Sequence, residues 1–153
     1  ICIQNTKIMN FKLKFFSLLL LIPFLGIGQN KFVGMWKNLD DEDGKEKSHI
    51  KVYTEGNELK ATITKLLPSA KFRTCDDCKG DLKGKPIEGM SIMYGMKKQA
   101  DGTYSGGTIL NPKNGKEYKC TISLDDDKTM RVRGYVGISA LGKTQYWYRL
   151  PNQ

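Results

Sequence analysis

The segment LKATIT, residues 59–64, alternates apolar and polar side chains without interruption. Successive side chains of an extended strand point to opposite faces of its sheet, so Leu59, Ala61 and Ile63 share one face. The segment KCTISL, residues 119–124, repeats the same period of two. Both segments therefore predict strands that have one buried face and one solvated face.

Similar segments recur along the chain after residue 28, and none of them keeps a helical period for three turns. Pairs that tolerate tight hairpin turns separate them, such as Asp43-Gly44, Asp101-Gly102 and Asn114-Gly115. We therefore expect antiparallel pairing between strands that are neighbours in sequence. The expected strands are residues 33–39, 49–54, 59–66, 91–97, 103–110, 117–124, 129–136 and 145–150.

A meander of eight short strands has two exposed edges unless the sheet closes on itself, and closure into a barrel removes both. We therefore predict an all-β fold, a small antiparallel up-and-down β-barrel of about eight strands. A sandwich of two sheets is the alternative, because strand number and alternation fit both architectures. The connection over residues 67–90 is unusually long, which makes it a first place to look for a functional site.

An uncharged apolar segment, residues 15–28, precedes the strands and follows two lysines and a candidate initiator, Met9. This arrangement is typical of a cleavable signal-peptide helix, with Gly26 and Gly28 as the small residues before the cut. The apolar run is shorter than the ~20 residues of a membrane-spanning helix. We therefore expect residues 1–28 to be a signal peptide.

Cleavage there leaves one exported domain, residues 29–153, periplasmic or secreted and without a transmembrane anchor. Residues 1–8 are interpreted as an over-extended start. Loss of the leader removes three lysines and no acids, so the formal net charge falls from +9 to +6. The remaining lysines and arginines are interspersed with acids, which is typical of a solvated surface and argues against nucleic acid as a partner.

Cys75 and Cys78 flank two aspartates, and thiols at this spacing form a disulfide, a redox pair or half of a zinc site. An oxidising compartment favours a structural disulfide, and the two intervening carboxylates disfavour a redox-active thiolate. Free thiols are a further alternative. A zinc site would need Cys120 and His49 as additional ligands, and Cys120 is expected to be a buried core residue.

Met90, Met93 and Met96 lie three residues apart, and methionine thioethers bind Cu(I) in some exported proteins. On a regular strand this spacing places successive side chains on opposite faces. Packing in the core is therefore favoured over a copper site.

Catalytic motifs are not apparent. His49 is the sole histidine, and the segment around Ser139 lacks the last glycine of a nucleophile elbow. The acids at residues 40–43 precede Gly44 in an expected hairpin turn, which favours a solvated turn over an acid–base pair or a calcium site. We therefore predict no catalytic residue, no metal and no cofactor.

Gly34-Met35-Trp36 lies in the first expected strand and Arg149 lies in the last. This pairing resembles the lipocalin-like pattern, in which a tryptophan closes the barrel floor and an arginine from the final strand packs across it. The resemblance implies a structural role for Gly34, Trp36 and Arg149. The alternative is that Trp36 is an ordinary core aromatic and Arg149 a surface charge.

A second resemblance covers nearly all of residues 29–153. The motifs that carry it are GMW at 34–36, DGK at 43–45 with Ser48, CDDCKGD at 75–81, KPIEGM at 85–90, GGTILNP at 106–112, NGKEY at 114–118, VRGYVG at 132–137 and QYWYR at 145–149. In this order they resemble the small exported bacterial proteins of domain-of-unknown-function family 2147. The resemblance implies a barrel-like envelope or secreted domain of unestablished activity, with no catalytic residue to carry over. Asn111 stands where the pattern has aspartate.

These observations favour a non-enzymatic protein that binds a small ligand or a component of the cell envelope. Eight strands enclose a space just wide enough for side chains or for one small ligand. The alternative is a filled barrel that serves as a structural or interaction module, and an enzyme or a thiol-redox protein using Cys75 and Cys78 is less favoured. A filled barrel would bind through its outer face, where the expected residues are Asn111, Lys116, Tyr118, Arg133, Tyr135, Gln145 and Trp147. Cross-strand pairing on a solvated sheet is the alternative role for this set.

Overall fold

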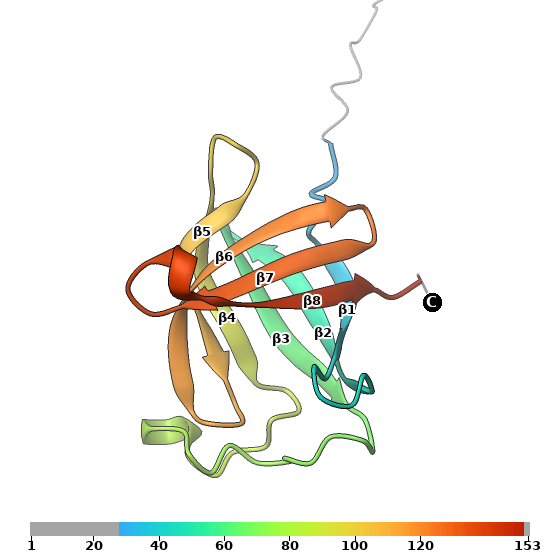
Figure 1. The fold of residues 1–153 in the computed structure, drawn as a ribbon, viewed down its shortest axis with the longest axis vertical. Coiled ribbons are helices and arrows are strands. Elements are labelled where there is room, and N and C mark those ends of the chain that lie inside the picture. The colour runs from blue at the N-terminus through green and yellow to red at the C-terminus, as the bar shows by residue number, and fades with distance from the viewer. Residues whose placement is uncertain (1–27, 152–153) are drawn as a thin grey trace, which may run out of the picture.

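The computed structural model describes residues 28–151, and these form one closed antiparallel barrel (Figure 1). Each strand pairs with its neighbours in sequence, and β8 pairs with β1. The predicted all-β, up-and-down barrel is confirmed, whereas the predicted signal-peptide helix lies outside the described residues. The strands are β1 (Gly34–Leu39), β2 (Glu46–Glu55), β3 (Glu58–Leu66), β4 (Ser91–Lys98), β5 (Tyr104–Asn111), β6 (Lys116–Asp126), β7 (Thr129–Tyr135) and β8 (Lys143–Arg149).

Strand β2 begins three residues earlier than alternation predicts. Glu46, Lys47 and Ser48 are all polar, so the expected strand began only at residue 49. Glu46 nevertheless pairs with Leu39 of β1 across an irregular register. Lys47 is only 8% exposed because its Nζ donates hydrogen bonds within the β1–β2 turn and to the β3–β4 connection. Tertiary contacts therefore extend β2 beyond the residues that its own sequence pattern predicts.

Aromatic side chains fill one end of the barrel, the end at which the described chain begins. The rings of Phe32 and Tyr104 meet edge to face, 5.0 Å between centroids, and Asn30 Nδ2 donates to the Tyr104 hydroxyl at 2.7 Å. Trp36 is fully buried, and its Nε1–H donates to the Phe32 carbonyl at 2.9 Å. The other core side chains of this half are Val52, Leu59, Ala61, Met93, Met96, Cys120, Ile122 and Met130.

Met93 and Met96 both face the interior, although a regular strand would turn them to opposite faces. Met96 lies opposite Leu59 and Met93 lies opposite Ala61, so β4 carries one extra residue against β3. Gly95 supplies this bulge with a φ of +70°, which favours glycine. The predicted core packing is thus correct, but the assumption of a regular strand was wrong.

The seam between β1 and β8 brings Trp36 and Arg149 together. The two residues are cross-strand partners, and the guanidinium carbon lies 4.2 Å from the centroid of the indole ring. A Cβ on Gly34 would lie 2.7 Å from the Arg149 Nη1 atom, so glycine gives the guanidinium room beside the ring.

The same guanidinium also caps three backbone carbonyls at this end of the barrel. Its Nε donates to Asp127 at 2.7 Å, its Nη1 donates to Val33 at 3.1 Å, and its Nη2 donates to Lys31. Arg149 therefore joins the entering chain, the β6–β7 turn and the last strand through one side chain.

The connection between β3 and β4 is an ordered structure held by a disulfide. Cys75 and Cys78 are bonded and buried, which confirms the predicted disulfide, and Thr74 forms an antiparallel bridge with Pro86. The Cys75 Sγ atom lies 3.3 Å from the carbonyl oxygen of Pro112, so the connection packs against the β5–β6 turn. The connection therefore folds under the lower end of the barrel in Figure 1.

Helical structure in residues 28–151 is confined to two 3₁₀ turns, η1 (Gly80–Leu82) and η2 (Ser139–Leu141). Neither turn is long or apolar enough to cross a membrane. Cys120 is a free, buried thiol of β6, and burial raises its pKa to about 12, which keeps it protonated and unreactive.

Replacing Arg149 with alanine should lower the free energy of unfolding by about 2 kcal/mol, because it removes the cation–π contact and leaves three carbonyls without their donor. Urea unfolding followed by tryptophan fluorescence measures this. Arg131→Ala is the matched control, because Arg131 forms a partly exposed ion pair with Asp125 and should lose less than about 1 kcal/mol. Equal losses in the two variants would contradict the role assigned to Arg149.

Replacing both Cys75 and Cys78 with alanine should lower the free energy of unfolding by about 2 kcal/mol. The loss is modest because the disulfide closes only a short loop and so constrains the unfolded chain little. Urea unfolding with and without a reductant measures the effect. Reductant should destabilise the wild-type protein and leave the double variant unchanged. A wild-type protein that is insensitive to reductant would argue against a structural disulfide.

Candidate functional site

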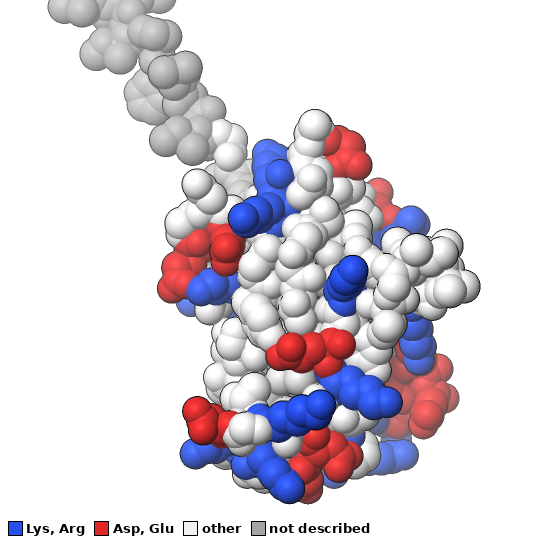
Figure 2. Space-filling view, turned by 90° about the vertical axis from the view of Figure 1, so that its left-hand side faces the viewer, with Lys and Arg blue, Asp and Glu red and all other residues white. Residues whose placement is uncertain are grey.

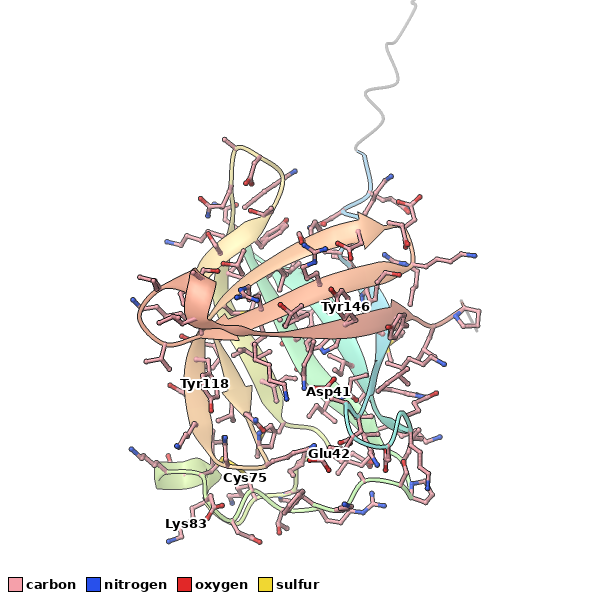
Figure 3. The ribbon with its side chains drawn as sticks, viewed as in Figure 1. Asp41, Glu42, Cys75, Lys83, Tyr118 and Tyr146 are labelled. Carbon is pink, nitrogen blue, oxygen red and sulfur yellow. A yellow bond between two sulfur atoms is a disulfide. The ribbon has the colours of Figure 1, made fainter. Side chains whose placement is uncertain are left out.

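A cavity of about 680 Å³ occupies the half of the barrel that the aromatic core leaves open. Its mouth lies where the β1–β2 turn, the β5–β6 turn and the β3–β4 connection meet. In Figure 3, Tyr118 lies on one side of this end of the barrel, and Asp41 and Glu42 lie on the other. Polar and charged side chains form about half of its lining, and the aliphatic part comes from Ile50, Ile63, Leu66, Ile87, Ile92, Ile109 and Val132.

Polar side chains interrupt this wall where the strands approach the mouth. Ser48 donates a hydrogen bond of 2.6 Å to Asn38 Oδ1, and Asn114 Nδ2 donates one of 3.1 Å to the Tyr118 hydroxyl. Gln145 also lines the cavity and forms no hydrogen bond through its side chain within the described residues. The cavity therefore combines an aliphatic wall with a polar part that can hydrogen-bond a small molecule.

Trp147 closes part of the inner wall of the cavity. Its side chain is 1% exposed, and its Nε1–H finds no acceptor among residues 28–151. A buried N–H without a partner costs about 1–3 kcal/mol. Trp147 is therefore a buried donor that the protein itself leaves unsatisfied.

Ion pairs surround the mouth. Lys113 Nζ lies 2.9 Å from Asp40, and Lys143 Nζ lies 3.1 Å from Asp41. The hydrogen bond from Lys113 holds the pKa of Asp40 well below its ordinary value, so the carboxylate stays charged. The mouth thus presents lysines and carboxylates that largely neutralise one another.

The seven residues expected on the outer face divide into two groups. Asn111, Tyr118, Gln145 and Trp147 line the cavity instead, so their predicted outward placement was wrong. Trp147 shows the reason, because it pairs with Met130 and both side chains are buried in the barrel. Their role in binding remains a prediction.

The other three residues lie outside the cavity. Lys116 borders a smaller surface hollow of about 420 Å³ with Tyr118 and Val136. Arg133 donates hydrogen bonds to the Ser139 and Ala140 carbonyls and thereby fixes the β7–β8 loop. Tyr135 ends β7 and packs beside Gly142 of the same loop.

Asn38 and Ser48 were missed as candidates for the site. Both were detectable, because Asn38 follows the inward-facing Trp36 by two residues and Ser48 precedes the inward-facing Ile50 by two. A polar residue at an inward position near a strand end was the available signal.

The zinc site with His49 and the calcium site at residues 40–43 were the alternatives considered for metal binding. His49 Nε2 lies 2.6 Å from Glu46 Oε1, on the outer side of β2. No group of three or more His, Cys, Asp or Glu side chains in the described part of the chain is arranged to hold a metal ion.

The fold is similar to that of a solved Helicobacter pylori protein described as belonging to the lipocalin family. The similarity has a TM-score of 0.69, covers 79% of this chain and 84% of that chain, and corresponds to 18% sequence identity. At this identity it establishes the fold alone. No curated protein matches the sequence significantly.

Residues 34–149 match the family described as uncharacterized proteins conserved in bacteria, DUF2147. The matched region runs from the first residue of β1 to the last residue of β8 and so includes every strand that lines the cavity. The chain therefore belongs to the DUF2147 family and has a lipocalin-like barrel fold.

Proposed function

We propose that the protein is an exported, non-enzymatic binding protein that takes one small, largely apolar ligand into the barrel cavity. The observation that carries the proposal is the division of the interior. Aromatic and methionine side chains fill one half, whereas about 680 Å³ remains open in the other. This volume falls within the ~300–1,000 Å³ of typical small-molecule sites.

Two other features support this function. The inner wall of the cavity includes several aliphatic side chains, so it favours a ligand that buries apolar surface against them. The uncharged segment at residues 15–28 and the Cys75–Cys78 disulfide support export to an oxidising compartment.

Filling the cavity should weaken ligand binding without unfolding the barrel. A Cβ on Gly134 would lie 3.5 Å from Tyr118 Cβ and 3.6 Å from Ile109 Cγ2, which are ordinary contacts. We therefore expect Gly134→Trp to project a large ring into the cavity and to weaken binding of the apolar dye N-phenyl-1-naphthylamine at least ~10-fold, about 1.4 kcal/mol. Dye fluorescence measures affinity, and circular dichroism verifies the fold.

Arg131→Trp is the matched control, because it places the same ring on the exposed face of the same strand. This variant should bind the dye as the wild-type protein does. Equal loss in both variants, or no dye binding by the wild-type protein, would contradict a ligand site inside the barrel.

A second candidate function is docking to a membrane surface through the β7–β8 loop. Val136, Ile138 and Leu141 are 72%, 63% and 80% exposed, and Arg133 holds this loop in place. The loop projects at the left of Figure 1, and Figure 2 shows that face with uncharged atoms at its centre. So small a patch falls short of the ~800 Å² per partner of a stable protein interface, whereas it is sufficient for shallow insertion between lipids.

Replacing Ile138 and Leu141 together with aspartate should therefore reduce co-sedimentation with vesicles of phosphatidylglycerol and phosphatidylcholine at least ~10-fold, because it removes two apolar side chains from the lipid contact. The single variants Ile138→Asp and Leu141→Asp should each reduce sedimentation, whereas Tyr146→Asp, which introduces the same single charge on the outer face of β8, should leave it nearly unchanged. The docking function would be refuted if the loop variant sedimented as the control does.

A further inference from the structure

The β7–β8 loop begins and ends in the wall of the cavity. Gly134 of β7 and Lys143 of β8 are cross-strand partners, and both of them line the cavity. The residues between them form the loop that carries the three exposed apolar side chains of the second candidate function. The surface proposed to dock to a membrane and the wall of the cavity therefore belong to one strand connection.

Pairing between β6 and β7 ends beside this loop. The last pair joins Lys119 to Tyr135, although β6 itself begins at Lys116. Tyr118 lies one residue beyond the last pair and has no partner on β7 within residues 28–151. In Figure 3 it lies on the same side of the barrel as the loop. At this point, side chains and not hydrogen bonds between β6 and β7 separate the interior from the surface.

The surface hollow of about 420 Å³ lies against this part of the wall. Leu110 and Tyr118 line both the hollow and the cavity. The hollow is also lined by Val136 of the loop and Leu82 of η1, whose side chains are 72% and 39% exposed. Apolar groups therefore extend from the exposed loop, past Tyr118, to the cavity.

The charged residues of the hollow suit the surface of a membrane. Its lining contains two lysines, Lys79 and Lys116, and one acid, Glu117. Both lysines are exposed. Lysines close to a bilayer are attracted to anionic lipid headgroups. The hollow beside the loop therefore carries a net positive charge where the docked protein would meet such headgroups.

An apolar ligand that crossed water between a membrane and the cavity would expose its surface on the way. Each methylene group exposed to water reduces the population of such an intermediate ~4-fold. Contact between the loop and the bilayer removes this step, because the ligand then stays in apolar surroundings.

From these features we infer that the ligand is a sparingly water-soluble component of membranes, which passes directly between the bilayer and the cavity beside Tyr118 while the β7–β8 loop is docked. This inference rests on the proposed function and joins it to the second candidate function. Tyr118 is the part of the wall that must turn aside, because its side chain borders both spaces. The neighbouring Gly134 has no side chain to hold the ring in place.

Transfer kinetics test this route. Diphenylhexatriene, an apolar dye almost insoluble in water, is bound to the protein and mixed in a stopped-flow instrument with vesicles of phosphatidylglycerol and phosphatidylcholine. The vesicles contain a nitrobenzoxadiazole-labelled lipid, which quenches the dye by energy transfer on arrival. The transfer rate should rise ~10-fold over a ~10-fold range of vesicle concentration, because contact between protein and vesicle limits it.

The outcomes separate the inference from the proposed function. A transfer rate independent of vesicle concentration would mean escape through water, which would overturn the inference and leave the proposed function intact. A protein that binds N-phenyl-1-naphthylamine but not diphenylhexatriene would also overturn the inference. Failure to bind either dye would overturn the proposed function.

Leu141→Asp should lower the transfer rate at least ~5-fold at a given vesicle concentration, because it removes an apolar side chain from the docked loop. Its affinity for the dye should not change, since Leu141 does not line the cavity. Tyr146→Asp is the matched control, because it introduces the same charge on the outer face of β8 and should transfer the dye as the wild-type protein does. Equal transfer rates in the two variants would contradict the direct route.

Tyr118→Ala should raise the rate of transfer on contact with vesicles ~3-fold, because a smaller side chain leaves the path beside the loop open. Tyr118→Phe keeps the ring and should transfer the dye at a rate close to that of the wild-type protein. An unchanged rate in Tyr118→Ala, or an increase that does not depend on vesicle concentration, would contradict the assignment of Tyr118 to the path.

Discussion

Three cross-strand pairs between β1 and β8 turn the meander into a barrel. The first pair joins Trp36 to Arg149, and the third joins Asn38 to Trp147. The first belongs to the filled end and the third to the wall of the cavity. Opening this short seam would expose two strand edges and would also remove one wall of the cavity. The closure of the fold and the existence of the cavity therefore depend on the same few residues.

Side-chain size decides how the closed interior is divided. An eight-stranded barrel is just wide enough for its own side chains to fill it. Around Trp36 the interior is filled by the side chains of Tyr104, Phe32 and the two methionines of the β4 bulge. Toward the other end the inward positions include Ser48 and Gly134, which occupy less space. The barrel is therefore neither filled nor empty throughout, and the cavity is the part that small side chains leave open.

Alternation in the sequence was sufficient to predict the strands and the barrel, but it could not predict which face every side chain takes. A bulge at Gly95 reverses the expected parity of β4 and turns Met93 and Met96 to the same side. In β8, Tyr146, Trp147 and Tyr148 are consecutive aromatics, so hydrophobicity alone shows no period. Their faces are set by pairing with β7 and β1, a long-range register that local pattern does not contain. For this reason Trp147 was expected outside and lies inside.

The polar groups of the cavity differ in how well the protein itself satisfies them. Phenylalanine at position 147 would contribute an apolar ring without an N–H to satisfy, so the indole carries a cost that the fold alone does not require. The carboxylates that could satisfy a donor are held at the mouth by Lys113 and Lys143. These ion pairs therefore lie at the rim, where each carboxylate has a lysine partner that offsets the cost of its partial burial. The fold thus keeps the carboxylates that line the cavity near its rim, while the indole N–H of Trp147 stays unpaired in the core.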